Sequence, residues 1–107
     1  MRKISELFGN DEKVWLYLDS PETWEKFTSA AETEGFRFGD LPRDKWNFGY
    51  VVSVRKNRNM GHVPIFLWCM SFSVNNSDLV RKIDFRRYYD GEENYYCEEP
   101  HFRGCLI

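Results

Sequence analysis

Three residues near the C-terminus carry side chains that could bind a metal ion. Cys97, His101 and Cys105 follow the spacing C-x3-H-x3-C, and thiolate and imidazole are the groups that zinc prefers in proteins. A structural zinc site takes four ligands, so His62 or Cys69 would have to supply the fourth. Cys69 lies in the most apolar stretch of the chain, where a small core residue is the usual occupant. We expect that these three side chains bind no metal ion and that the protein has no cofactor. A zinc site is the alternative.

Residues suited to catalysis are few. Nucleophilic catalysis needs a nucleophile, a base and an orienting group close together, but the chain has only two histidines. His62 lies in a predicted turn and His101 lies in the tail. Acidic residues at positions 84–93 could pair their carboxylates, although such residues beside a turn are usually solvated. The sequence contains no glycine-rich phosphate loop, so we expect a protein that is not an enzyme.

Basic residues gather beside two tyrosines in a single stretch. Basic and aromatic side chains on a sheet face contact phosphates and stack on bases of single-stranded nucleic acid. However, Arg86 and Arg87 would point to opposite faces of a strand, and the acidic residues that follow repel phosphate. The same pattern is explained if these residues lie on an edge strand, where charged side chains deter association between sheets. A single-stranded nucleic-acid-binding accessory protein is therefore the alternative function, with contacts expected at Arg81, Lys82, Arg86 and Arg87.

Acidic and aromatic residues alternate in the tail. Tyrosines among carboxylates can anchor a chain on a basic protein surface, and the charges steer the encounter. The alternative is that the aromatic side chains fold back onto the core, and one sequence does not separate the two. The residues expected to contact a protein partner are Tyr88, Glu92, Glu93, Tyr95 and Tyr96.

Length and charge limit the classes of protein. At 107 residues the chain has room for one domain. The 15 basic and 17 acidic residues nearly balance, so a field that attracts nucleic acid is not expected. There is no apolar run of about 20 residues that could span a membrane, and the N-terminus lacks the apolar core of a signal peptide. We expect a cytoplasmic protein with reduced thiols and no membrane contact.

The elements that must position these residues are clearest in the first half. Val14–Leu18 is apolar and aromatic, which predicts a strand, and Ser20 offers a helix cap. Apolar residues at helical spacing then continue to Gly35, which ends the helix. Phe36 and Phe38 alternate with polar residues and predict a second strand.

Strand patterns dominate the second half. Apolar and polar residues alternate over residues 50–55, which predicts a strand with one solvent-exposed face. Lys56–His62 predicts a hairpin turn. Val63–Val74 is apolar on both faces of a strand, which predicts a central strand of the sheet. A further strand is predicted from Arg81 onward. The best-buried side chains are expected at Phe66, Trp68, Met70 and Phe72.

Together these patterns predict one α+β domain over residues 1–107. One main helix packs on a mostly antiparallel sheet of four to five strands. Residues 1–13 form an N-terminal extension, and residues 91–107 form the acidic, aromatic tail.

Two stretches carry a resemblance to known proteins. AAETEGFRFGD (Ala30–Asp40) and IDFRRYYDGEENYY (Ile83–Tyr96) resemble a loose group of small uncharacterised α+β proteins of Firmicutes phages and mobile elements. The chain departs from that group at Leu41, where a glycine is common, so this loop is expected to differ.

The setting of that group is a bacterial cytoplasm, where such small proteins include anti-CRISPR and other anti-defence inhibitors. The resemblance implies a non-enzymatic inhibitor that binds a bacterial defence effector such as a CRISPR nuclease. This is an analogy of setting rather than of mechanism. It leaves the partner's identity and the oligomeric state open.

Overall fold

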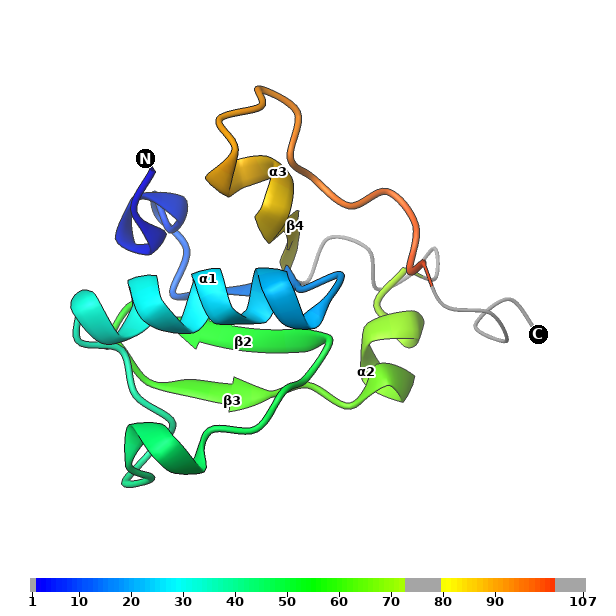
Figure 1. Ribbon diagram of the computed structural model, residues 1–107. Helices are drawn as coiled ribbons and strands as arrows, with labels where there is room; N and C mark the ends of the chain where they lie inside the picture. Colours follow the sequence, from blue (N-terminus) through cyan, green and yellow to red (C-terminus); the bar gives the residue numbers. More distant parts are fainter. Residues whose placement is uncertain (1, 73–79, 102–107) are drawn as a thin grey trace.

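The centre of the protein is a four-stranded sheet with the strand order β3-β2-β1-β4 (Figure 1). This computed structural model describes residues 2–72 and 80–101. β1 (Lys13–Tyr17) pairs antiparallel with β2 (Val51–Arg55) and parallel with β4 (Arg81–Asp84). β3 (Met60–His62) forms an antiparallel hairpin with β2. The predicted α+β class with a mostly antiparallel sheet is confirmed.

The main helix, α1 (Pro21–Thr33), lies across the sheet in Figure 1. Its predicted start is confirmed, because the Ser20 hydroxyl accepts a hydrogen bond from the Thr23 N–H at 3.2 Å. Its predicted end is confirmed as well, because Gly35 adopts a positive φ of 84° just beyond the helix. The face that α1 turns inward carries Trp24, Phe27 and Ala31, all of them buried.

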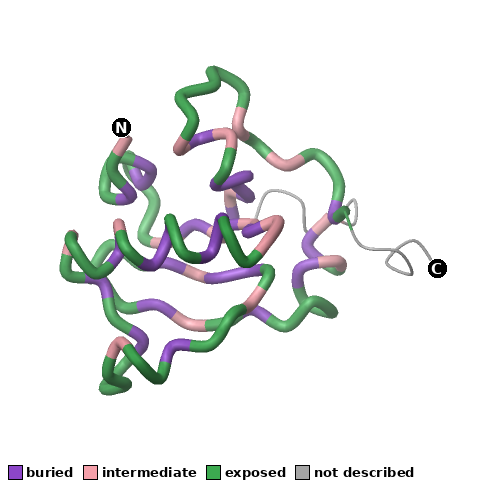
Figure 2. The backbone as a smooth tube through the Cα atoms, viewed as in Figure 1, coloured by how far each residue is buried: buried purple, intermediate pink, exposed green. Residues whose placement is uncertain are grey.

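The main core lies between α1 and the sheet, and the N-terminal extension contributes to it. The 3-10 turn η1 (Ile4–Leu7) buries both of its apolar side chains, Ile4 and Leu7. In Figure 2 the buried positions follow the strands and the inner side of α1. The buried cluster combines side chains from several elements, including Leu7, Leu16, Phe27, Phe36, Val52, Ile83 and Phe85.

The prediction of a central strand over Val63–Val74 is wrong. Residues 65–70 form the helix α2 (Ile65–Met70), which lies beside the sheet (Figure 1). Only Trp68 in this helix is buried, whereas Phe66 is 69% and Met70 46% exposed. A run that is apolar on both faces of a strand is equally apolar all round a helix, so periodicity does not separate the two. Phe72 is partly buried, and Val74 lies outside the described residues.

Two shorter predicted strands also differ from the structure. Phe36 and Phe38 are buried, but residues 36–38 make only an isolated bridge, between Arg37 and Asn59. The strand predicted from Arg81 onward stops at Asp84 and continues as the short helix α3 (Phe85–Tyr89). The last three residues of the predicted turn over 56–62 form β3, while η2 (Arg43–Lys45) is a single 3-10 turn in the predicted loop.

The tail runs antiparallel beside β4 as far as Cys97. The Asp84 N–H donates to the Tyr95 carbonyl at 2.7 Å, and the Cys97 N–H donates to the Lys82 carbonyl at 2.9 Å. Ile83 and Tyr96 form an antiparallel bridge between these two hydrogen bonds. Within the described ranges, no helix combines the length and the apolar character that crossing a bilayer requires.

Candidate functional site

The most unusual surface of the protein is the apolar face of α2. We use this name for Ile65, Phe66, Leu67 and Met70, four large apolar side chains that are all exposed. Figure 2 shows exposed positions through most of this helix. α2 carries no acidic or basic residue of its own. Single exposed apolar residues are ordinary, but several on one short element are characteristic of interaction sites.

One buried side chain fixes α2 to the rest of the protein. The Trp68 ring packs against Trp15 and Tyr17 of β1, with ring centroids 6.4 and 6.2 Å away. Phe72 packs edge-on against the same ring at 5.0 Å. The indole N–H of Trp68 donates to the Pro100 carbonyl at 2.9 Å. The helix is therefore anchored on one side by Trp68, while its apolar face points outward.

Acidic residues lie beside this anchor. Glu98 and Glu99 immediately precede Pro100 and are both exposed. In Figure 1 the tail descends from α3 and ends next to α2. The segment that Trp68 contacts at Pro100 therefore follows two acidic residues, while α2 itself carries no charged residue.

Only three of the five residues predicted to contact a protein partner are exposed. Tyr88 is buried, and its hydroxyl donates to the Lys3 carbonyl at 2.5 Å. This side chain therefore belongs to the core, and burial raises the pKa of Tyr88 to about 12. Tyr95 is partly buried and packs edge-on against Tyr88 at 5.0 Å. The side chains exposed for contact are Glu92, Glu93 and Tyr96.

The cations of the nucleic-acid alternative are engaged within the protein. The Arg81 guanidinium donates to Asp11 at 2.5 Å and also to the carbonyls of Leu7 and Phe8. Lys82 is buried, with its ammonium 3.2 Å from the Val80 carbonyl.

The two remaining arginines pair with carboxylates. Arg86 donates to Asp19 at 2.6 Å, and Arg87 Nε lies 3.7 Å from an Asp84 oxygen. These pairs hold elements together, so the four cations do not form an open row for phosphates.

The structure retains part of the predicted metal set and adds a residue that the spacing did not reveal. Cys97 and His101 lie together with Asp84, with one donor atom from each within 4.8 Å of the others. Asp84 joins them only through the pairing of the tail with β4. Cys69 is disulfide-bonded and cannot be the fourth ligand, so the expectation of reduced thiols does not hold there. Cys105 lies outside the described residues.

The other predicted ligand, His62, lies apart from these three residues. The His62 ring packs against both Trp24 and Phe38, with centroids 5.8 and 4.9 Å away, and is not among these donors. Burial raises the pKa of the Cys97 thiol to about 12, and Asp84 shifts it the same way.

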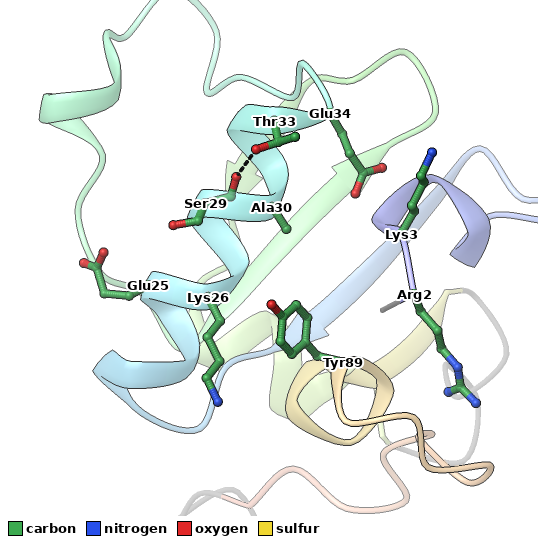
Figure 3. Close-up of a pocket in the computed structure, with 9 residues that line it drawn as sticks. All are labelled: Arg2, Lys3, Glu25, Lys26, Ser29, Ala30, Thr33, Glu34 and Tyr89. Atoms are coloured by element: carbon green, nitrogen blue, oxygen red, sulfur yellow. Dashed lines mark hydrogen bonds between the residues drawn. The ribbon is translucent and has the colours of Figure 1, made fainter.

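A groove of about 600 Å³ lies between the N-terminal segment, α1 and α3 (Figure 3). Its polar groups mainly hold the fold together. The Glu34 carboxylate accepts hydrogen bonds from the N–H groups of Ile4 and Ser5 at 2.8 and 3.0 Å. Lys26 lies over the Tyr89 ring at 5.9 Å. The lining mixes both signs of charge, and Arg2 and Lys3 of the N-terminal segment form part of the wall.

Comparison of the chain with known protein families, curated proteins and solved structures finds no match.

Proposed function

We propose that this chain is a non-enzymatic binding protein that docks the apolar face of α2 onto a partner protein. The observation that carries the proposal is the exposure of four large apolar side chains on a helix of six residues. Apolar area left in water is unfavourable by about 25 cal/mol per Å². A partner that covers this face therefore gains free energy without any change of the fold.

The chemistry of the surface selects the kind of partner. A short apolar helix fits an apolar groove, and contacts from successive turns give the specificity. Glu98 and Glu99 are exposed in the segment that leads to the contact between Pro100 and Trp68, so a groove with basic residues at its edge is favoured. The exposed Glu92 and Glu93 on the same tail would add to the steering of that encounter.

The resemblance described above supplies the setting that we propose for this binding. The partner would be a bacterial defence effector such as a CRISPR nuclease, and the chain would be an inhibitor encoded by a phage or mobile element. Such effectors have basic grooves for nucleic acid, and occluding one needs contact area and negative charge rather than catalysis. The choice of effector is supported by this resemblance alone.

The test compares two charge substitutions at exposed leucines. Leu67→Glu places a carboxylate in the apolar face of α2, whereas Leu41→Glu places one in an exposed loop. Purified CRISPR nucleases are titrated with each variant and with the wild type. We expect the wild type and Leu41→Glu to bind one nuclease equally and Leu67→Glu to lose binding, with all three melting within a few degrees of one another.

Three outcomes would overturn the proposal. The first is that no effector binds, and the second is that Leu67→Glu binds as well as Leu41→Glu. The third concerns self-association, measured by light scattering on the eluting protein. A stable dimer that Leu67→Glu converts to monomer would assign the apolar face of α2 to a second copy of this chain.

A further inference from the structure

We propose that Asp84, Cys97 and His101 bind a zinc ion that fastens the tail to β4. One donor atom from each residue lies within 4.8 Å of the other two. Ligand atoms around tetrahedral zinc are roughly 3–4 Å apart, given bond lengths of about 2.0–2.3 Å. The three groups therefore need only a small inward movement to share an ion.

The donor types favour zinc over other common cations. One sulfur, one nitrogen and one oxygen form a mixed set that suits a borderline-soft ion. Magnesium and calcium select oxygen ligands almost exclusively. Three protein ligands leave a fourth position, which a water molecule would fill.

Backbone pairing brings two of the ligands together. Asp84 is the last residue of β4, and its N–H donates to the tail at Tyr95. The Cys97 N–H donates to the Lys82 carbonyl two residues earlier on β4. The register of the tail thus sets the separation of the Asp84 carboxylate and the Cys97 thiol. Asp84 is 6% exposed, and its two contacts to Arg87 are long, at 3.4 and 3.7 Å.

The third ligand is held by different contacts. The His101 ring stacks on Tyr17 with centroids 4.8 Å apart, and Nδ1 lies 3.7 Å from a Glu99 oxygen. At 3.7 Å the contact with Glu99 is longer than a hydrogen bond, so stacking on Tyr17 is the main constraint on the ring. His101 also has a positive φ of 66°, which is uncommon for a residue other than glycine. The hydrogen bond from Trp68 to Pro100 holds the backbone next to it.

Two cations lie near the proposed ion and oppose its binding. Arg87 contacts the Asp84 carboxylate, and Lys82 and Arg87 both act electrostatically on Cys97. Zinc would share the carboxylate with Arg87, so we expect micromolar affinity, weaker than that of a site with four sulfur and nitrogen ligands. The ion would fix residues 97–101 beside α2. The inference does not depend on the proposed docking function.

The test uses the full chain after removal of metal with a chelator. Cobalt replaces zinc in such sites, and a thiolate ligand gives it a charge-transfer absorption band. We expect stoichiometric cobalt binding with that band, its displacement by zinc, and a rise in the wild-type melting temperature with added zinc. Cys97→Ser should abolish the band, and Asp84→Asn should weaken cobalt affinity at least tenfold.

His62→Gln is the matched control, because it removes a histidine that lies away from the three donors. This variant should bind cobalt as the wild type does. Asp84→Asn keeps the shape of the helix cap, so its metal-free melting temperature shows whether a loss of binding is due to unfolding. The inference is overturned if the wild type gives no band, if the band survives Cys97→Ser, or if a folded Asp84→Asn binds cobalt with unchanged affinity.

Discussion

Trp68 and Phe66 stand two positions apart on α2 and have opposite surroundings. Trp68 is fully buried among aromatic rings, whereas Phe66 is the most exposed large apolar side chain of the described residues. We expect Trp68→Ala to lower the free energy of unfolding by about 3–5 kcal/mol, because it empties a packed site. Phe66→Ala should change it by less than about 0.5 kcal/mol. Urea unfolding of both variants measures the difference.

The same pair tests the shape of this segment. In a strand the two side chains would lie on the same face and share one environment. Large and equal losses from both substitutions would therefore support the strand that the sequence suggested and contradict the helix.

Asp19 gives a prediction for the dependence of stability on pH. Burial acts to raise the pKa of Asp19, but hydrogen bonds from Thr23 and Arg86 outweigh it and hold the pKa below its usual range. A carboxyl group with a lowered pKa in the folded state stabilises the protein above its unfolded pKa, and the contribution disappears as pH falls through the folded value.

Asp19→Asn should consequently be less stable than the wild type at pH 7, and the gap should narrow below about pH 4. Urea unfolding at several pH values measures the gap. Asp40→Asn, at an exposed loop position, is the control for loss of one negative charge. A gap that stays constant from pH 7 to pH 2 would contradict the role given to the pair with Arg86.

At the scale of elements, Glu34 connects the end of α1 to the N-terminal turn η1. Its carboxylate accepts the N–H groups of Ile4 and Ser5, which have no partner within a 3-10 turn. We expect Glu34→Ala to destabilise the protein by about 1–2 kcal/mol, as the loss of a helix cap does. Glu32→Ala is the control, since the Glu32 carboxylate makes a long surface contact of 4.0 Å with Arg43. Urea unfolding measures the two variants. If both substitutions lower the free energy of unfolding equally, η1 is held by its apolar side chains alone.

Elements with local signals could be predicted from the sequence. The cap at Ser20 and the stop at Gly35 act on neighbouring backbone groups, so α1 follows from a few residues. α2 could not be predicted, because its apolar run fits a buried strand and a helix equally. The helix α3 could not be predicted for a related reason. Ile83, Phe85 and Tyr89 fit the alternation of a strand, but Asp84 caps a helix that begins at Phe85.

The candidate sites show the same division. The spacing of Cys97 and His101 is visible in the sequence, but the place of Asp84 beside them depends on the register between the tail and β4. Tyr88 and Tyr96 stand in similar sequence surroundings, and only packing makes one buried and the other exposed. The exposure of the apolar face of α2 likewise depends on how this helix packs in the fold, which cannot be deduced from the sequence pattern.

At the scale of the whole molecule, charge is close to balanced, and the arginines of the predicted nucleic-acid surface pair with carboxylates. The net charge is −2, and the arginines of the predicted nucleic-acid surface contact Asp11, Asp19 and Asp84. Opening those pairs to reach phosphates would sacrifice contacts that join the N-terminal extension and the β1–α1 loop to β4 and α3.

We accordingly expect no binding of a labelled single-stranded oligonucleotide, even at low salt. The measurement is a fluorescence anisotropy titration at two salt concentrations. Phosphate contacts would make affinity fall with salt, with a log–log slope of roughly −0.7 for each phosphate neutralised on a single strand. Binding with such a slope, lost in Arg86→Ala but kept in Lys45→Ala, would contradict the expectation and assign the surface around α3 to nucleic acid. Lys45 is the control because it is an exposed basic residue in η2, outside that cluster.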